Sequence, residues 1–223
     1  MSKRDTVRTD DGTTWTLEKL LGVGGQGEVW SASAGDRTAA AKLYHPHSAT
    51  REQRDALARL IGKGSPAPQF LWPFALIQGE GRLGYVMDLR EARMRPLEDF
   101  MARRIEPSLP TLLRAGQQLA DAFLRLHALG LCYRDISFAN VFFDPRTGDV
   151  RICDNDNVDV SGSDVGGVLG TPRFMAPEVV RREAVPSDQT DRYSLAVLLF
   201  FMLYGGHPLD GAREARIRCL DVP

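Results

Sequence analysis

The spacing of apolar residues changes near Arg90, and this change constrains the fold more than any other feature of the sequence. Before Arg90, short apolar runs are separated by glycine-containing turns, which is typical of strands. After it, longer segments repeat their apolar residues at helical spacing. A run of strands followed by a run of helices predicts an α+β fold, because a parallel α/β sheet would need the two to alternate.

The first part of the chain predicts a small lobe of strands with one helix. The helix is expected to begin after Thr50, which can cap its first turn, with Gln53 three residues further on. The buried stripe of this helix would consist of Ala56, Leu57, Leu60 and Ile61. The expected strands are 15–29, interrupted by a glycine cluster, 38–44 after a Gly35-Asp36 turn, 70–78 and 83–89.

The remainder predicts a mainly helical large lobe. Helices are expected at 112–129 and 189–204, and two short strands at 140–143 and 150–153 flank a glycine-containing turn. The resulting divisions are a polar N-terminal tail at 1–14, a small lobe at 15–90 and a large lobe at 91–223.

The composition excludes several classes of protein. With 223 residues, 43% hydrophobic and 26% charged, the chain is typical of a soluble globular protein. Its net charge of −1 gives no general attraction to nucleic acid or to an anionic membrane. The most apolar run, 195–204, is too short to cross a bilayer. We therefore expect neither a nucleic acid nor a membrane as partner.

The cysteines and the first residues bear on location. Cys132, Cys153 and Cys219 are an odd number without metal-binding spacing, which favours a reducing compartment. The first fifteen residues are polar and lack the apolar core of a signal peptide. A cytoplasmic protein is the expectation.

A glycine cluster, Gly22-x-Gly24-x-x-Gly27, lies between two expected strands. Glycines at this place let backbone amides approach phosphate oxygens without a Cβ in the way. An ordinary glycine-rich hairpin explains the cluster equally well. The strands on both sides argue against a dinucleotide-binding turn, which leads into a helix, and a P-loop would end in Gly-Lys-Ser/Thr.

Polar residues in apolar surroundings mark three further places. Lys42 lies within an apolar strand and either needs a partner for its charge or extends to solvent at an edge. Asp135 and Asn140 lie between apolar segments, where unpaired polar residues would be costly. His45-x-His47 has no acid or cysteine nearby, so a polar turn is a better interpretation than a metal site.

These features occur in the order of a protein kinase. Tyr133-Arg134-Asp135 is followed by Asn140 and then by Asp154, and later by Gly170-Thr171-Pro172 and Ala176-Pro177-Glu178. From Trp15 to its end the chain resembles the eukaryotic-like, bacterial-type serine/threonine protein kinases. The resemblance implies a two-lobed fold, with ATP and Mg²⁺ bound between a β-rich N-lobe with one helix and a mainly helical C-lobe.

The resemblance also implies roles for individual residues. Asp135 would orient the substrate hydroxyl and accept its proton, and Asn140 and Asp154 would bind Mg²⁺. Together with Lys42, which would hold the α- and β-phosphates, Asp135 and Asn140 form the expected catalytic set. The implied ATP-binding residues are Leu21, Gly22, Gly24, Gly25, Gly27, Val29, Ala40, Lys42, Glu52, Met87, Asp88, Arg90, Phe142, Cys153 and Asp154.

Within that set, Met87 resembles the gatekeeper before the adenine-binding hinge. Cys153 would face the nucleotide pocket, although a small apolar strand residue is the ordinary interpretation. The implied supporting or regulatory residues are Arg134, Thr171, Glu178, Asp191, Ser161 and Ser163. Asp191 would hold the backbone of the catalytic loop, and Arg134 could receive a phosphate placed on Ser161 or Ser163.

Several residues depart from the family pattern. Ser137 stands where these kinases have a lysine that neutralises the transferred phosphate, and Asn155 and Asp156 replace the Phe-Gly of Asp-Phe-Gly. Glu52 is the only glutamate available to pair with Lys42, but it could equally be an exposed acid in the first helical turn. The chain ends soon after the helix at 189–204, so the large lobe is expected to be truncated.

The leading prediction is an ATP- and Mg²⁺-dependent protein kinase that phosphorylates serine or threonine hydroxyls, with this chain itself among the candidate substrates. The alternative is a pseudokinase that binds nucleotide and acts by docking to a partner. A small-molecule kinase is disfavoured, because such enzymes lack the Ala-Pro-Glu segment. The final segment also resembles kinases from tellurite-resistance and stress gene clusters. Substrate, activating signal and oligomeric state are not predicted.

Overall fold

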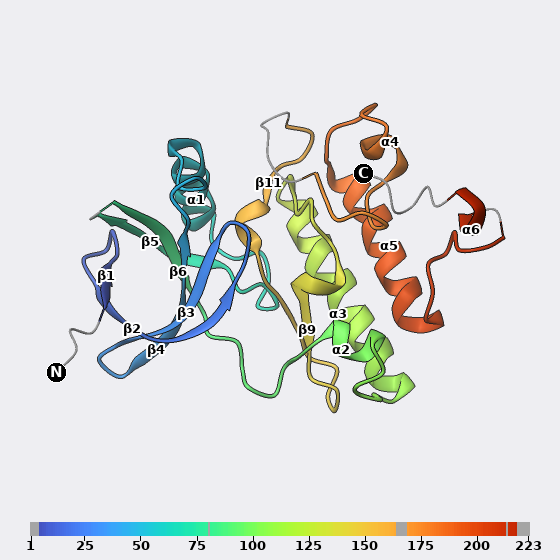
Figure 1. Ribbon diagram of the computed structural model, residues 1–223, viewed down its shortest axis with the longest axis horizontal. Helices are drawn as coiled ribbons and strands as arrows, with labels where there is room; N and C mark the ends of the chain where they lie inside the picture. Colours follow the sequence, from blue (N-terminus) through green and yellow to red (C-terminus); the bar gives the residue numbers. More distant parts are fainter. Residues whose placement is uncertain (1–4, 80, 164–168, 213, 218–223) are drawn as a thin grey trace. The chain divides into compact units, whose positions relative to one another are not determined.

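The computed structural model describes residues 5–79, 81–163, 169–212 and 214–217, and the chain divides into two compact units (Figure 1). The first unit comprises Met1–Ser65 and Leu71–Glu91, and the second comprises Pro66–Phe70 and Ala92–Pro223. The boundary after Glu91 lies next to the boundary predicted after Arg90. The segment Pro66–Phe70 belongs to the second unit because Gln69 accepts a hydrogen bond from the Ile152 amide.

The first unit is sheet-rich with one helix, as predicted, and its described residues form a six-stranded antiparallel sheet. The strand order is β1-β2-β3-β4-β6-β5. The strands are β1 (Thr6–Arg8), β2 (Thr14–Val23), β3 (Gly27–Ala34), β4 (Arg37–Tyr44), β5 (Pro73–Gly79) and β6 (Arg82–Met87). Its hydrophobic core lies against one face of this sheet and contains Val7, Trp15, Leu17, Ala32, Ala39, Ala41, Ala75, Ile77 and Val86.

The prediction that residues 1–14 form only a polar tail is wrong. β1 pairs with β2, with Val7 opposite Trp15, and both side chains are buried in the core. The Asp10 carboxylate accepts a hydrogen bond from the Leu76 amide, which ties the following turn to β5. The short segment Thr-Val-Arg carries one apolar residue, so it shows no periodicity, and only its packing makes it a strand.

Helix α1 (Arg51–Lys63) begins where predicted, with the Thr50 hydroxyl accepting a hydrogen bond from the Gln53 amide. Leu57 and Leu60 are its buried residues, and α1 packs on β5 and β6. The indole of Trp72 donates to the Leu60 carbonyl at 3.0 Å. Because Trp72 is engaged with α1, the strand predicted at 70–78 begins only at Pro73.

The described residues of the second unit form α2 to α6 and five short strands. The helices are α2 (Leu97–Met101), α3 (Leu109–Ala128), α4 (Pro177–Val180), α5 (Asp188–Tyr204) and α6 (Glu214–Ile217). The strands are β7 (Arg95–Pro96), β8 (Leu131–Cys132), β9 (Val141–Phe143), β10 (Val150–Ile152) and β11 (Asp159–Val160). Two 3₁₀ turns, Phe138–Asn140 and Asn155–Asn157, lie beside β9 and β10.

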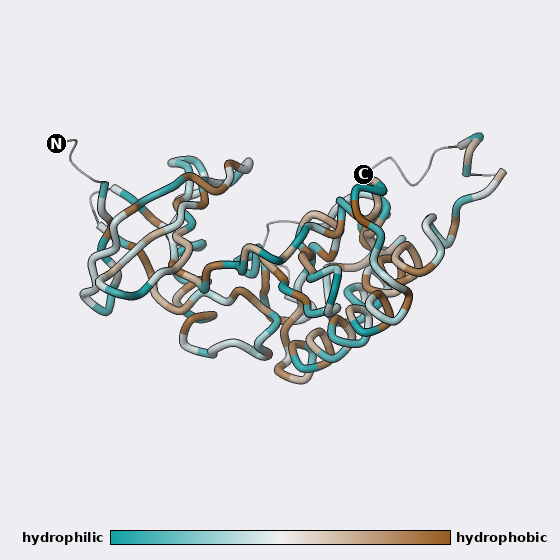
Figure 2. Tube along the Cα trace, turned by 90° about the horizontal axis from the view of Figure 1, so that it is seen from below, coloured by the Kyte–Doolittle hydropathy of each residue, from teal (hydrophilic) through white to brown (hydrophobic). Residues whose placement is uncertain are grey.

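The two long helices of the second unit pack against each other. α3 begins at Leu109, three residues before its predicted start, because Ser108 caps the Thr111 amide and Pro110 fits the first turn. α5 begins at a capping box formed by Ser187 and Thr190. Hydrophobic and hydrophilic residues alternate along the helices of this unit, as expected for helices that each bury one face (Figure 2).

Among the described residues, no helix combines the length and the hydropathy needed to cross a membrane.

Candidate functional site

The glycine cluster forms the turn between β2 and β3. The Gly24 amide donates to the Gly27 carbonyl at 2.8 Å, which closes the turn. Leu21, Gly22, Gly24 and Gly25 are exposed, whereas Gly27 is buried. The turn therefore presents its backbone to solvent, as a loop that covers phosphates must do.

Two histidines from the segment after β4 hold this turn. The Nε2 atoms of His45 and His47 lie 3.2 Å from the carbonyl oxygens of Gly24 and Gly25, respectively, and the two rings stack. The His45 amide also donates to the Gln26 carbonyl. In a trans peptide the carbonyl and the following amide point in opposite directions. The amides of Gly25 and Gln26 therefore point away from the histidines, and the polar-turn interpretation of His45-x-His47 is favoured.

Replacing Gly27 by alanine is expected to destabilise the first unit by about 1–3 kcal/mol, because a Cβ there would lie 2.1 Å from the Leu43 carbonyl oxygen. That contact would push β3 away from β4 beside Lys42. Gly25→Ala is the matched control, since no atom lies within 4 Å of its added Cβ. Urea unfolding of both variants measures the difference, and equal midpoints would contradict the close approach of the two strands.

Strand register places four implied ATP-binding residues on one face of the sheet. Val29 lies opposite Lys42, and Ala40 lies opposite Met87. Ala39 and Ala41 face the hydrophobic core, and side chains alternate between the two faces along a strand. Ala40 and Lys42, with their partners Met87 and Val29, therefore share the opposite face of the sheet. Asp88, exposed, and Arg90, half-buried, follow directly after β6.

Gly84 positions the Lys42 strand and was missed by the sequence analysis. A Cβ on Gly84 would lie 2.1 Å from the Lys42 carbonyl oxygen, so only glycine allows β6 to pair with β4 at this point. An isolated glycine within an apolar strand was the available signal, because it often marks a close approach of two backbones.

Glu52 does not pair with Lys42. Its carboxylate lies in the exposed first turn of α1, where backbone amide and Thr50 hydrogen bonds lower its pKa. No ion pair joins it to Lys42 in the part of the first unit that the structure describes. An acid in the first helical turn is stabilised there by the unpaired amides and the helix dipole, so its side chain stays at the helix start.

Asp135 is held from both sides in the second unit. The Thr171 hydroxyl donates to Oδ1 at 2.6 Å, and the Asn140 side-chain amide donates to Oδ2 at 3.0 Å and to the Asp135 carbonyl at 2.9 Å. Asn140 is buried in the 3₁₀ turn before β9. The carboxylate is therefore oriented by two neighbours that lie 5 and 36 residues further along the chain.

The β9–β10 hairpin brings Asn140 and Asp154 to the same end. Ile152 pairs with Val141, and the Cys153 amide donates to the Asn140 carbonyl at 3.0 Å, which extends the ladder by one residue. Asp154 follows in a left-handed conformation with φ of 52°, which is uncommon for a residue other than glycine. Phe142, half-buried, lies in β9.

The chemistry of Asn140 and Asp154 fits a magnesium ion. Because the Asn140 nitrogen is used for Asp135, its side-chain oxygen is the atom left to meet a cation. A carboxylate and an amide oxygen are hard ligands of the kind that Mg²⁺ prefers, and Mg²⁺ sites in phosphate-transferring enzymes use few protein ligands. The described residues include no group of three or more His, Cys, Asp or Glu that could hold a metal alone.

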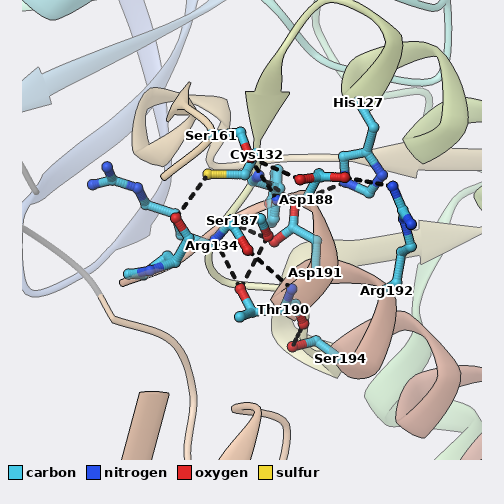
Figure 3. Close-up of polar contacts among 12 residues, drawn as sticks. His127, Cys132, Arg134, Ser161, Ser187, Asp188, Thr190, Asp191, Arg192 and Ser194 are labelled. Atoms are coloured by element: carbon cyan, nitrogen blue, oxygen red, sulfur yellow. Dashed lines mark hydrogen bonds and ion pairs between the residues drawn. The ribbon is translucent and has the colours of Figure 1, made fainter. Parts of the chain in front are cut away.

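Asp191 holds the segment that carries Asp135 (Figure 3). Its carboxylate, 1% exposed, accepts hydrogen bonds from the amides of Tyr133 and Arg134 at 2.6 and 2.9 Å. The same carboxylate lies 2.9 Å from the His127 ring of α3. Asp191 lies in the first turn of α5, so the start of this helix is joined to α3 and to residues 133–140, called the catalytic segment because they carry Asp135 and Asn140 of the expected catalytic set.

Tyr133 connects the catalytic segment to the segment of Asp154. Its hydroxyl donates to the Cys153 carbonyl, and its ring packs edge-on against Phe123. Burial raises the pKa of the Tyr133 hydroxyl well above its usual value, and the nearby Cys153 and Asp154 add to this shift. The hydroxyl therefore stays protonated and acts as a donor at neutral pH.

Arg134 and the two candidate serines have distinct contacts. Arg134 is buried and pairs with Asp159 at 3.1 Å, and it also donates to the hydroxyl of Ser163 at 2.9 Å. Ser161 instead donates to the Asp188 carboxylate and accepts from the Asp188 amide at the start of α5 (Figure 3). Only Ser163 lies where a phosphate would meet Arg134.

The residues that depart from the family pattern are buried. Ser137 is 2% exposed, and its hydroxyl has no hydrogen-bond partner among the described residues. Asn155 is fully buried and donates to the Ile152 carbonyl, and Asp156 is also buried. The Asn155 side chain thus fixes the turn after Asp154 by a local hydrogen bond where the family uses an apolar side chain.

Two further positions complete the site. Phe138, which the sequence analysis did not single out, packs edge-on against Phe174 and Phe201 and so attaches the catalytic segment to α5. An aromatic residue among the polar residues of this segment was the signal that could have identified it. Glu178 lies half-buried in the first turn of α4.

Comparison with known proteins defines the class. Residues 15–221 match the family described as protein kinase domain. The chain is 30% identical over 226 residues to the serine/threonine-protein kinase PknA of Mycobacterium tuberculosis, covering 94% of this chain and 51% of that protein. It is 26% identical over 225 residues to the serine/threonine-protein kinase PkaB of Streptomyces coelicolor, covering 92% and 52%.

The chain therefore belongs to the protein kinase domain family. Its relatives place it among the eukaryotic-like serine/threonine kinases of bacterial type. It spans about half the length of the curated relatives that it matches.

Proposed function

We propose that this chain is an ATP- and Mg²⁺-dependent protein kinase that transfers the γ-phosphate to serine or threonine hydroxyls. The orientation of Asp135 carries this proposal, because Thr171 and Asn140 each fix one oxygen of its carboxylate. An oriented carboxylate can align a hydroxyl for attack and accept its proton.

The other residues act by holding the reactants. Lys42 and the outward amides of the glycine turn would hold the phosphates of ATP, and Asn140 and Asp154 would hold Mg²⁺. When bound, Mg²⁺ supplies positive charge against the phosphate oxygens. Asp191 and Tyr133 keep the catalytic segment in place through the hydrogen bonds described above.

Ser137, together with Asn155 and Asp156 in place of Phe-Gly, favours the alternative of a nucleotide-binding pseudokinase. The short Ser137 hydroxyl replaces a cation that would stabilise the transferred phosphate, and it is buried without a partner among the described residues. The retained Asp135, Asn140 and Asp154 favour catalysis, so we expect an active but slow enzyme.

Transfer of labelled phosphate tests the proposal. The protein is incubated with γ-labelled ATP and Mg²⁺, alone and with a generic protein acceptor, and the products are hydrolysed for phosphoamino acid analysis. Phosphoserine or phosphothreonine that disappears with EDTA supports the kinase. Mg²⁺-dependent ATP binding without transfer would instead support the pseudokinase, and loss of both would contradict nucleotide binding altogether.

ATP with Mg²⁺ is expected to slow alkylation of Cys153. This thiol is half-buried near the Asn140 carbonyl, at 3.4 Å. Cys132 is an internal control, because burial raises its pKa to about 11 and keeps it as an unreactive thiol at pH 8. Mass spectrometry after treatment with N-ethylmaleimide follows both sites, and equal Cys153 labelling with and without ATP would count against its place in the ATP site. Cys219 lies outside the described residues.

Ser163 is expected to be the phosphate-accepting serine of its loop. A phosphate on Ser163 would meet the Arg134 guanidinium, whereas one on Ser161 would face the Asp188 carboxylate and remove a helix cap. After incubation with ATP and Mg²⁺, Ser163→Ala should lose loop phosphate and Ser161→Ala should keep it. Phosphate mapped to Ser161, or unchanged in both variants, would contradict this assignment.

A cytoplasmic location, the absence of nucleic-acid and membrane partners, self-phosphorylation and the relation to tellurite-resistance clusters remain predictions from the sequence.

A further inference from the structure

The Lys42 ammonium lies near the rings of two neighbouring tyrosines. Its Nζ is 5.6 Å from the centre of the Tyr44 ring and 5.9 Å from that of Tyr85, and the two rings are 6.3 Å apart. Strand geometry produces this arrangement, because Lys42 and Tyr44 share one face of β4 and Tyr85 is the β6 residue opposite Lys42. Lys42 is 5% exposed and Tyr85 is fully buried. At these distances an aromatic ring attracts a cation.

Helix α1 contacts the Tyr44 ring system through a neutral side chain. The Gln53 side-chain amide donates to the Tyr44 hydroxyl oxygen at 2.9 Å. Gln53 was expected to belong to a capping box, but only its backbone amide takes part in the cap. Its side chain bonds to Tyr44 instead, while the neighbouring Glu52 is exposed.

We propose that Tyr44, held by Gln53, is the positioning residue through which α1 controls the placement of Lys42. The chain of contact runs from the first turn of α1 through the Gln53 amide to the Tyr44 hydroxyl, and from the Tyr44 ring to the Lys42 ammonium. Movement of α1 would therefore shift the ring against which Lys42 rests. The inference rests on the proposed role of Lys42 in holding ATP phosphates.

The hydrogen bond between Gln53 and Tyr44 joins two uncharged groups. A hydrogen bond between an amide and a phenol is screened by salt far less than an ion pair is. α1 therefore positions Lys42 without bringing it a carboxylate. The coupling between α1 and the lysine should persist at ionic strengths that weaken ion pairs at protein surfaces.

Paired substitutions test the link. Tyr44→Phe keeps the ring and removes the hydroxyl, and Gln53→Leu keeps the approximate volume and removes the amide. Each should raise the Kd for ATP with Mg²⁺ by about 3- to 10-fold, the effect of losing one hydrogen bond. The double variant should be no weaker than the weaker single variant, because both changes break the same link.

Two control variants separate positioning from general stability. Gln53→Glu replaces the donating amide by a carboxylate that can accept a hydrogen bond from the Tyr44 hydroxyl, so the contact is kept with its direction reversed and ATP should bind within about twofold of the wild type. Glu52→Gln alters the adjacent exposed residue and should have no effect. Effects of the two single variants that simply add, or a Glu52→Gln loss equal to that of Gln53→Leu, would overturn the proposal.

A measurement without nucleotide separates this inference from the function that it presupposes. Modification of Lys42 by trinitrobenzenesulfonate, followed by peptide mass spectrometry, reports how firmly the amine is held. Tyr44→Phe and Gln53→Leu should both accelerate it, whereas unchanged rates would overturn the positioning role. If the rates change but the wild type does not bind ATP, the positioning role stands and the proposed function fails.

Discussion

Replacing Asp135 by asparagine is expected to reduce phosphate transfer by at least about 100-fold, the lower range for loss of a general base. Asparagine has nearly the same shape but cannot accept a proton at neutral pH. It also places an amide where Thr171 and Asn140 both donate hydrogen bonds, so one of these contacts is lost. Initial rates of transfer from labelled ATP measure the effect.

The structure supplies the controls for this substitution. Asp121→Asn makes the same chemical change at an exposed carboxylate on α3 and should leave the rate unchanged. The Kd of Asp135→Asn for ATP with Mg²⁺ should stay near that of the wild type, because Asp135 acts on the acceptor hydroxyl. Transfer by Asp135→Asn at a rate within a few-fold of the wild type would remove Asp135 from the reaction.

Replacing Asp191 by alanine is expected to lower the free energy of unfolding by about 3–5 kcal/mol. The change leaves the amides of Tyr133 and Arg134 buried without an acceptor, and each such group costs about 1–3 kcal/mol. It also removes the partner of the buried His127 ring. Urea unfolding, monitored by circular dichroism, measures the loss.

Asp188→Ala is the matched control for Asp191. Asp188 lies one turn away on the same helix, but it is more exposed and contacts Arg192 and Ser161 near the surface. Its loss should cost about 1 kcal/mol or less, the value of a surface ion pair or a weak cap. If the two variants unfold at the same urea concentration, Asp191 is not the anchor of the catalytic segment.

The sequence was sufficient to predict the class of fold and most of its elements. The change of periodicity near Arg90 separated the strands from the helices, and the Thr50 cap located the start of α1. These features are local: turn residues, caps and apolar spacing act between neighbours in the chain. The order of Asp135, Asn140 and Asp154 likewise indicated one site through the resemblance to protein kinases, and the β9–β10 hairpin brings the last two to the same end.

Other features depended on contacts between residues far apart in the chain. β1 exists because Val7 completes the core beside Trp15, and Gly84 is required because its strand meets the Lys42 backbone. The ion pair between Arg134 and Asp159 was likewise not apparent from the spacing of these residues in the sequence. Each of these depends on register and packing between strands or loops, for which a single sequence carries little signal.

The surroundings of Lys42 show most clearly which features the sequence predicted and which depended on tertiary contacts. The sequence by itself determined that Lys42 lies in a strand, that a helix with a glutamate follows, and that the order of motifs belongs to a protein kinase. Only the tertiary structure decided which side chain of that helix contacts the tyrosine beside the lysine. The amides of the first helical turn hold Glu52 at the surface, while Tyr44, two residues after Lys42 in β4, accepts a hydrogen bond from Gln53.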